Sequence, residues 1–345
     1  MKMKKSISQR EIARILGVNA STVSRTLKGQ PGVSAELREQ IISLAKTFGY
    51  RPNPFAMSLR YGYTRTLGII VPDLSFSHYA HIVKWIEAEA RKNGYMCIVT
   101  DSGGKYSNEV ECVEQLFNMY VEGIAICLSQ ETVDLSHLLK LKENHIPVVL
   151  FDRVADAGFP TVSSNDVDAA RQATLHLIES GKKRIAFLGG PNRIKQSLNR
   201  KHGYLEALRE KQMEIRKEMI KSGPVSFNSG LSDTMELLSM PEPPDAILAD
   251  HGLLSLAAFQ AIISRGLCIP QDVAIIGFMS DWVSSMACPR ITFVKQNLRE
   301  ISRRTFRLLM EQIEHERKQD VENTDEVEKI RHIIVKAQLN IREST

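Results

Sequence analysis

The residues from Ser8 to Gly29 have the types and spacing needed to read DNA. Small and polar side chains lie together on the second of two helices predicted here: Asn19, Ala20, Ser21, Thr22, Ser24, Arg25 and Lys28. In the major groove an arginine donates two hydrogen bonds to guanine, an alanine contacts the thymine methyl group, and hydroxyl groups bond bases or phosphates. We therefore predict that these residues contact DNA and that Arg25 reads a base.

The two helices that position these side chains form a predicted helix-turn-helix. Ala13 allows close contact between the helices, Gly17 permits the left-handed backbone of the turn, and Val23 fills the space between them. The inward face predicted from helical spacing is Ile12, Ile15, Leu16, Val23 and Leu27. The same pattern also fits an amphipathic helical hairpin whose polar residues are only solvated.

A third helix follows in the sequence and is expected to complete a small helical domain. Ser34 is a suitable N-cap and Gly49 a suitable C-terminal stop. One face of this helix carries the residues predicted to pack on the first two helices: Leu37, Ile41, Leu44, Ala45 and Phe48.

Charge is distributed unevenly along the 345 residues. Residues 1–65 contain 12 Lys and Arg against 3 Asp and Glu, a net charge of +9, whereas the remainder carries −4. A basic segment alone fits a solvated face or a membrane surface equally well, but its coincidence with the reading helix favours DNA. The hydrophobic content of 43% and charged content of 25% are typical of a globular protein with two or three domains.

Several other functional classes lack their motifs. The five cysteines form no CxxC pair, so we expect reduced core residues and neither a zinc site nor disulfides. The sequence has no HExxH, GxGxxG, P-loop or GxSxG motif, and we predict no metal and no cofactor. No signal peptide precedes the first helix and no apolar run is long enough to span a membrane, so a cytoplasmic location is expected.

From residue 66 onward, apolar runs of strand length alternate with helical stretches. Continuous apolar runs indicate strands buried on both faces, and hence parallel sheets. The region is long for one sheet, so we predict an α/β core of two doubly wound lobes that divide near residue 163.

Ligands of such sheets bind beyond the carboxyl ends of the strands. The corresponding loops here are 73–79, 101–102, 152–153, 164–166, 189–200, 250–253 and 279–282. Their acidic, amide, guanidinium and indole groups suit a polyhydroxylated ligand, because sugar hydroxyls both donate and accept hydrogen bonds. Asp152 and Asp166 form a conceivable carboxylate pair, but acidic residues are common at strand ends, so catalysis is not expected.

The helix-turn-helix string VNASTVSRTLKG, followed by PGVS and GYRPNPFAMSLRYGYTRTLGIIVPD, resembles the LacI/GalR family of bacterial transcription regulators. The resemblance extends from Ile7 to the C-terminal LNIREST. Asn53 and Pro54 provide a cap and first turn for a very short helix from Phe55 to Arg60. The resemblance implies that this segment is a hinge helix that orders on the operator and presents Ala56 and Leu59 to the minor groove. By composition alone the same segment reads as a linker.

The resemblance also implies the domain limits. These are a DNA-binding domain at 1–51, a hinge at 52–65 and an effector-binding and dimerisation core at 66–345. The core lobes have the periplasmic-binding-protein fold. The first is expected at about 66–163 and 293–325, and the second at about 164–292 and 326–345.

Effector contacts follow partly from the resemblance and partly from the strand-end loops. Arg200 matches the family's effector-contacting arginine, His78 and Tyr79 match an aromatic pair, and Asn165 with Asp166 matches an Asp-Asn pair. Asp73, Asp281 and Trp282 complete the predicted set. The sequence departs from the family pattern at His251-Gly252, at Met279 within GFMSD and at Phe76-Ser77, which leaves the effector unidentified.

We therefore predict a homodimeric repressor, without enzymatic activity, that binds an inverted-repeat DNA operator and is controlled by a small molecule, a sugar or sugar derivative, held between the lobes. Two alternatives remain at this point. One is a periplasmic-type solute receptor without a role on DNA, which the core alone would fit. The other is a sugar-processing enzyme.

Overall fold

The computed structural model describes residues 7–27, 29–50, 63–156, 158–322 and 331–345. It divides into two compact units, Met1–Thr64 and Arg65–Thr345, and each is described by itself.

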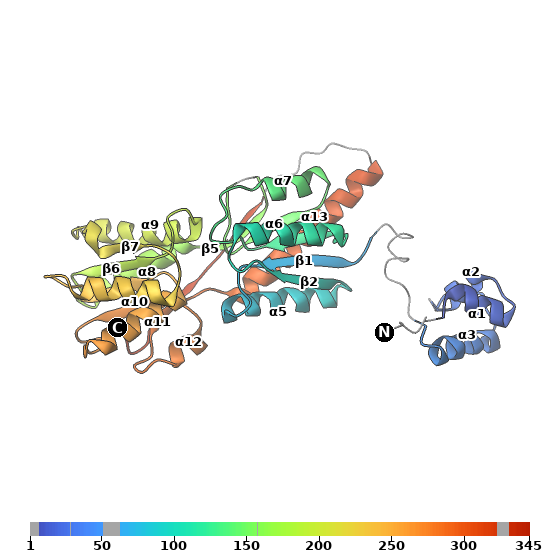
Figure 1. Ribbon diagram of the computed structural model, residues 1–345, viewed down its shortest axis with the longest axis horizontal. Helices are drawn as coiled ribbons and strands as arrows, with labels where there is room; N and C mark the ends of the chain where they lie inside the picture. Colours follow the sequence, from blue (N-terminus) through green and yellow to red (C-terminus); the bar gives the residue numbers. More distant parts are fainter. Residues whose placement is uncertain (1–6, 28, 51–62, 157, 323–330) are drawn as a thin grey trace. The chain divides into compact units, whose positions relative to one another are not determined.

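The described residues of the first unit form three helices: α1 (Gln9–Leu16), α2 (Ala20–Leu27) and α3 (Ala35–Thr47) (Figure 1). Ser8 caps α1 reciprocally with Glu11, and Gly17 ends that helix at a φ of 67°. The core of this unit consists of Ile12, Ala13, Val23, Ile41 and Ala45. The spacing of these residues in the sequence thus predicted the helix-turn-helix and its third helix.

Two predicted core residues of this unit are exposed instead. Ile15 is 55% exposed because it lies about 100° around α1 from the direction shared by Ile12, Ala13 and Leu16. Phe48 is 54% exposed because α3 ends before it, and Tyr50 packs against the core in its place.

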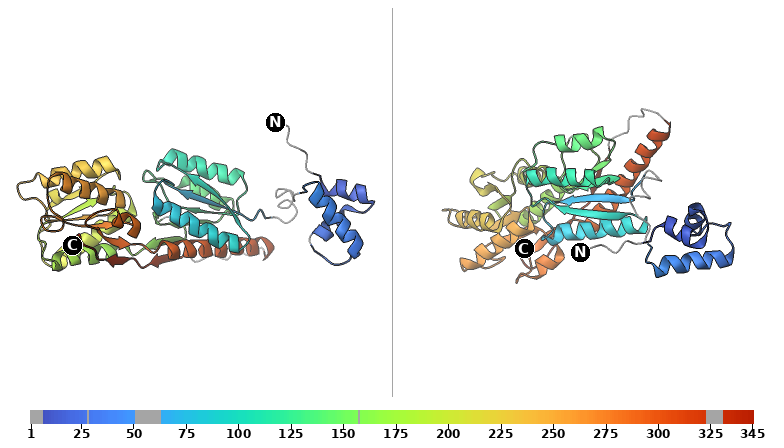
Figure 2. Two further views of the ribbon diagram at one scale, coloured as in Figure 1. Left: turned by 90° about the horizontal axis from the view of Figure 1, so that it is seen from below. Right: turned by 45° about the vertical axis from the view of Figure 1, so that its right-hand side comes forward.

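The second unit contains two six-stranded sheets, seen as separate layered lobes in Figures 1 and 2. The first sheet is entirely parallel and has the order β11-β5-β4-β3-β1-β2. Its strands are β1 (Thr66–Val71), β2 (Met96–Asp101), β3 (Gly123–Ile126), β4 (Val148–Phe151), β5 (Thr161–Ser164) and β11 (His332–Val335).

The second sheet has the order β12-β10-β9-β8-β6-β7 and is parallel except for β12, which runs antiparallel to β10. Its strands are β6 (Ile185–Gly189), β7 (Ile220–Ser222), β8 (Ala246–Ala249), β9 (Ala274–Phe278), β10 (Thr292–Lys295) and β12 (Gln338–Asn340). Strands β5 and β7 were not predicted, because TVSS and IKS are short and only partly apolar.

Helices cover both faces of each sheet, as a doubly wound fold requires. On the first sheet, α5 (Ser77–Lys92) and α13 (Leu298–Glu322) cover one face, and α6 (Tyr106–Asn118) and α7 (Ser136–Glu143) the other. On the second sheet, α8 (Asp166–Glu179) and α9 (Lys195–Glu210) face α10 (Phe227–Leu238) and α11 (Gly252–Ser264) across the strands. The short elements α12 (Asp281–Ser285) and η1 (Lys217–Met219) complete this lobe.

The chain passes between the lobes three times, but two crossings differ from the prediction. Strand β10 belongs to the second lobe, because Phe293 and Val294 pack there beside β9, so the return to the first lobe begins only with α13. Strand β11 remains in the first sheet beside β5, and the last crossing lies between Val335 and Gln338. The predicted lobe limits at 293 and 326 were therefore wrong.

All five cysteines are free. Cys112 and Cys127 are buried as predicted, whereas Cys268 and Cys288 are exposed in loops of the second lobe, so the expectation that all five are core residues was wrong.

Candidate functional site

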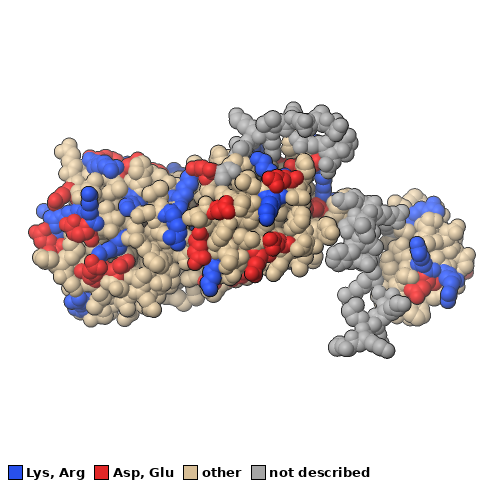
Figure 3. Space-filling model, turned by 45° about the horizontal axis from the view of Figure 1, so that its top comes forward, with Lys and Arg blue, Asp and Glu red and all other residues tan. Residues whose placement is uncertain are grey.

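Helix α2 presents the predicted DNA-reading side chains on one surface. Asn19, Ala20, Ser21 and Arg25 are exposed and Thr22 is half-buried, while Val23 is fully buried against the other helices. On the face of this unit visible in Figure 3, basic side chains prevail over acidic ones. The exposed face of α2 thus combines small residues that permit close approach with one long guanidinium.

Ser24 does not belong to this surface. It is 5% exposed, because Val23, Ser24, Thr26 and Leu27 share the inward side of α2. Its prediction as a DNA contact was therefore wrong. Lys28, Ala56 and Leu59 lie outside the described residues, and their roles stay predictions.

In the second unit, polar side chains from both lobes meet at the carboxyl ends of the strands. We call this group the inter-lobe cluster. Its members are His78, Tyr79, Asp152, Arg153, Asp166, Gln196, Ser197, Arg200, Asp250, His251 and Gln296.

Asp152 connects the two lobes. Its Oδ1 accepts hydrogen bonds from Nε2 of Gln196, on α9 of the second lobe, and from Nε2 of Gln296, each at 3.1 Å. Its Oδ2 lies 2.9 Å from Nε2 of His78, on α5 of the first lobe. Asp152 directly follows β4 and has a φ of 58°, a left-handed backbone that few residues other than glycine adopt. The turn directs its carboxylate toward the second lobe.

Arg200 holds the second lobe's part of the cluster together. Its Nε donates to Asp166 Oδ1 at 2.7 Å, its Nη1 donates to the backbone oxygen of Asp250, and its guanidinium lies 4.0 Å from the centre of the Phe278 ring. Arg200 and Asp166 are 2% and 3% exposed. A buried ion pair needs further hydrogen bonds to offset its desolvation, and the backbone oxygen supplies one.

Asp250 and His251 form a second buried pair. Asp250 Oδ1 lies 2.6 Å from His251 Nδ1, and its Oδ2 accepts from the backbone N–H of Gly190 at 3.0 Å. Burial lowers the pKa of His251 in spite of the neighbouring Asp250. The imidazole is therefore neutral at pH 7 and carries its proton on Nδ1, so Nε2 is a hydrogen-bond acceptor.

The three carboxyl groups titrate differently because their partners differ. Burial alone would raise the pKa of all three carboxyl groups. The pKa of Asp152 is nevertheless lowered, because His78, Arg200 and Arg153 favour its charged form. The pKa of Asp250 is lowered by His251, by Arg200 and by the backbone N–H of Gly190. For Asp166 burial outweighs Arg200, and its pKa rises from 3.8 to about 6.

The raised pKa of Asp166 predicts a pH dependence of stability. The folded state binds this proton more tightly than the unfolded state, so the stabilisation is complete below about pH 4 and is lost as the pH rises through about 6. A rise in the Asp166 pKa from 3.8 to about 6 corresponds to about 3 kcal/mol. Between pH 4 and 7, the free energy of unfolding of the wild type should fall by about this amount relative to Asp166→Asn, measured by urea denaturation.

Asp166→Asn serves as the reference for this titration, because it removes the titrating group and nearly keeps the size of the side chain. Parallel pH profiles for wild type and Asp166→Asn would show that Asp166 titrates normally.

Four predicted effector residues join the inter-lobe cluster, namely His78, Tyr79, Asp166 and Arg200, and the other four have different partners. Asp73 accepts from the N–H and hydroxyl of Ser75 in its own turn. Asn165 uses its amide to bond Asp168 and the backbone N–H of Ala337 at the last crossing. Asp281 pairs with Arg342 at 3.0 Å, and Trp282 is 61% exposed.

Seven members of the cluster were missing from the predicted set. Asp152-Arg153 and Asp250-His251 directly follow buried strands, a signal that the sequence contains and that marked their loops as candidates. Gln196 and Ser197 lie within the candidate loop 189–200 but were not singled out, and Gln296 carries no such signal. The packing of α9 and the crossing after β10 bring these residues to Asp152 and Gly190.

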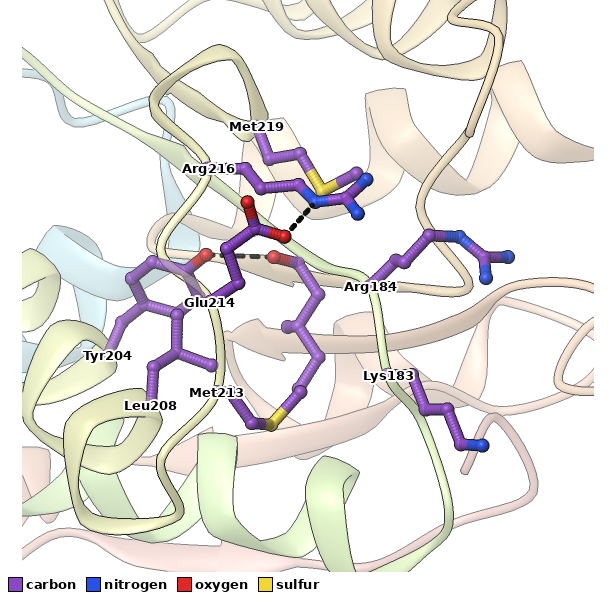
Figure 4. Close-up of a pocket in the computed structure, with 9 residues that line it drawn as sticks. Lys183, Arg184, Tyr204, Leu208, Met213, Glu214, Arg216 and Met219 are labelled. Atoms are coloured by element: carbon purple, nitrogen blue, oxygen red, sulfur yellow. Dashed lines mark hydrogen bonds and ion pairs between the residues drawn. The ribbon is translucent and has the colours of Figure 1, made fainter.

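A pocket of about 50 Å³ lies elsewhere in the second lobe (Figure 4). It is near Ile185, where β6 begins, whereas the cluster lies where the strands end. Tyr204 donates to the backbone oxygen of Ile185, and Arg216 pairs with Glu214 and Glu242. The two glutamates neutralise Arg216, the pocket is small, and we assign it no ligand.

Among the described residues, no group of three or more His, Cys, Asp or Glu side chains is arranged to hold a metal ion. No helix in the same part of the chain is long and apolar enough to cross a membrane.

A helix-turn-helix unit joined to a two-lobed α/β core with polar groups between the lobes defines a DNA-binding regulator with a periplasmic-binding-type domain. Residues 9–53 match the family model of "Bacterial regulatory proteins, lacI family", and residues 64–342 match that of "Periplasmic binding proteins and sugar binding domain of LacI family". The chain belongs to the LacI family, and it is a DNA-binding transcriptional regulator with the family's sugar-binding type of core.

Individual relatives agree with this assignment. The chain is 32% identical to catabolite control protein A of Priestia megaterium, over 87% of this chain and 90% of that protein. It is 28% identical to the transcriptional repressor CytR of Escherichia coli K12, over 91% and 93%. The structure of the transcriptional regulator CelR in complex with cellobiose matches with a TM-score of 0.73 and 27% identity, covering 98% of this chain and all of that one.

Proposed function

We propose that the protein is a cytoplasmic repressor that binds an inverted-repeat operator as a homodimer. A small-molecule effector, a sugar or sugar derivative, is held at the inter-lobe cluster and controls operator binding. The hydrogen bond from Gln196 of the second lobe to Asp152 of the first carries the proposal, because a ligand at these residues contacts both lobes at once.

The exposed face of α2 supports the DNA-binding part of this proposal. One helix-turn-helix reads one half-site, and a two-fold dimer therefore reads an inverted repeat. In the same proposal Ala56 and Leu59 enter the minor groove between the half-sites, where a leucine wedge unstacks a base step and bends the duplex.

Control by an effector requires that the ligand prefer one arrangement of the lobes. In the arrangement of the lobes seen here, Asp152 contacts Gln196, Gln296 and His78. A ligand that competes for these groups changes the free energy of this arrangement. An inducer prefers the arrangement with weak operator affinity.

We propose no catalytic turnover. A serine nucleophile needs a hydrogen bond to its general base. Ser197 Oγ and His251 Nε2 are both buried without a hydrogen-bond partner among the described residues, although Asp250 orients the imidazole.

Selection of binding sites from a random duplex pool tests the proposal. The salt concentration must be fixed, because phosphate contacts make affinity strongly salt-dependent. We expect enrichment of an inverted repeat, with two protein chains per duplex measured by analytical ultracentrifugation. Enrichment of a single half-site by one chain would contradict the dimer, and no enrichment with or without cell extract would contradict the repressor.

Arg25→Ala is expected to relax specificity at one base pair of each half-site. The exposed guanidinium has the reach for a bidentate contact with guanine, which discriminates against other bases by about 1–3 kcal/mol. Competition between the selected operator and single-base variants measures this loss.

Arg10→Ala is the matched control, since Arg10 is an exposed arginine on α1. Its removal should weaken binding to all sequences equally, as expected for a phosphate contact. The same uniform weakening in Arg25→Ala would show that Arg25 contacts only the backbone.

A further inference from the structure

The inter-lobe cluster contains buried hydrogen-bonding atoms that the protein itself leaves unused. They are Arg153 Nε, Arg200 Nη2, Ser197 Oγ and His251 Nε2, none of which has a hydrogen-bond partner among the described residues. Buried polar atoms are nearly always paired, and an unpaired one costs free energy. Four such atoms in one cluster indicate the hydrogen-bonding pattern of a bound ligand.

Arg153 contributes a buried positive charge to this group. This residue is 8% exposed and forms no ion pair with any residue that the structure describes. The three carboxylates of the cluster already have hydrogen-bond partners. Asp152 bonds two glutamine amides and His78. Asp166 bonds Arg200, and Asp250 bonds His251 and a backbone N–H. Arg153 is therefore the buried cation of the cluster without a direct ion-pair partner among the described residues, although the nearby carboxylates of Asp152 and Asp250 favour its charged form. A ligand can supply the direct partner.

Both arginines of the cluster lie beside aromatic rings. The guanidinium of Arg153 lies 5.8 Å from the centre of the Tyr79 ring, and that of Arg200 lies 4.0 Å from the centre of the Phe278 ring. A ligand at the cluster therefore meets guanidinium groups at these positions in place of free aromatic faces. This favours recognition through oxygen atoms over stacking of a sugar ring.

His251 offers a hydrogen-bond acceptor to a ligand, whereas the two guanidinium groups offer donors. Its Nε2 is an acceptor because Nδ1 donates to Asp250. The complementary ligand group is a hydroxyl, which donates to Nε2.

We infer that the effector is a small hydroxylated compound carrying an anionic oxygen group, either a carboxylate or a phosphate. Arg153 Nε, Arg200 Nη2 and Ser197 Oγ bind the anionic group, and His251 Nε2 accepts from a hydroxyl. This inference rests on the proposed function and restricts its effector from sugars in general to sugar acids or sugar phosphates.

Anion binding by the full-length protein tests the inference without knowledge of the natural effector. Inorganic phosphate, acetate and neutral glycerol serve as probes at constant ionic strength made up with chloride. We expect phosphate or acetate, but not glycerol, to raise the unfolding temperature of the wild type. The same anion should fail to do so in Arg153→Met, whose dissociation constant should be higher by about tenfold or more.

Two variants separate this site from general anion binding. Arg184→Met removes a half-buried arginine at the opposite edge of the second lobe, whose Nε donates to the oxygen of Pro243, and should keep the anion response. Arg153→Lys keeps the positive charge and should keep part of the anion response. An equal response in wild type and Arg153→Met, or none in the wild type, would overturn the inference.

The final arm compares matched sugars by calorimetry: D-glucose, D-glucuronate and D-glucose 6-phosphate, and the corresponding galactose series. Tighter binding of the acids identifies a carboxylate ligand, and tighter binding of the phosphates a phosphate ligand. A neutral sugar that binds more tightly than both charged forms, and equally well to Arg153→Met, would overturn the inference. If that neutral sugar releases the operator, the proposed function still stands.

Discussion

Replacing Arg200 by alanine is expected to lower the free energy of unfolding by about 3–5 kcal/mol at pH 7.5, since one partner of a buried ion pair is left behind. Arg200 is 2% exposed and bonds both Asp166 and the backbone oxygen of Asp250. Removing it leaves a buried carboxyl and a buried carbonyl without their donor. Urea denaturation followed by circular dichroism measures the change.

The double variant Arg200→Met with Asp166→Leu distinguishes a charge effect from lost packing. Replacing both members of a buried pair by apolar residues of similar size is often neutral or stabilising. The double variant should therefore recover most of the stability that Arg200→Ala loses. If it is as unstable as Arg200→Ala, the contact of the guanidinium with Phe278 contributes more than the ion pair.

Arg200→Ala should also remove the response to the effector. In the proposed function the effector lies at the cluster that contains Arg200, and in the further inference its Nη2 binds the ligand. A hydrogen bond to a charged group contributes about 1.5–3 kcal/mol. The effector concentration that gives half-maximal operator release should rise about tenfold to a hundredfold. An unchanged concentration in folded protein would place the effector elsewhere.

Gly203→Ala is expected to destabilise the second lobe by about 3 kcal/mol or more, at or above the upper end of typical overpacking costs. A Cβ at this position would lie 2.0 Å from the backbone oxygen of Val167 and 2.9 Å from the backbone nitrogen of Arg171. Because both obstacles are backbone atoms of α8, rotation of a side chain cannot relieve the clash. The helices α8 and α9 must move apart.

This separation has a functional consequence that can be measured. Asp166 begins α8 and Arg200 lies on α9, so moving the helices apart lengthens the ion pair between them. Gly203→Ala should lose stability and the effector response together. Gly223→Ala is the control, because no atom lies within 4 Å of its Cβ position, and its effect should be within about 0.5 kcal/mol. Equal stability of the two variants would contradict the close helix contact.

The amino-acid sequence was sufficient to predict the helix-turn-helix and the character of the core. Ile12, Val23 and Ile41 are buried where helical spacing placed them, and Gly17 has the predicted left-handed backbone. These features depend on neighbours within one or two helical turns. Ile15 and Ser24 were misplaced because the exact direction of a helix face depends on how the other helices pack.

In the two lobes, too, the sequence pattern predicts local elements but not how distant elements pack together. Apolar runs predicted most of the parallel strands, yet the pattern does not state which sheet a strand joins, since β10 and β11 are short apolar runs that fit either lobe. Hydrogen bonding to β9 and β5 decided their places.

The sequence by itself determined which residue types stand at the strand ends, including Asp152, Asp166, Asp250 and Arg200, and it thereby indicated a polar site at that edge. Only the tertiary structure decided which of them meet. The pair of Arg200 with Asp166 joins positions 34 apart, and Gln296 reaches Asp152 over 144 positions. Such contacts depend on where the chain crosses between lobes, and burial there leaves Arg153 Nε without a hydrogen-bond partner among the described residues.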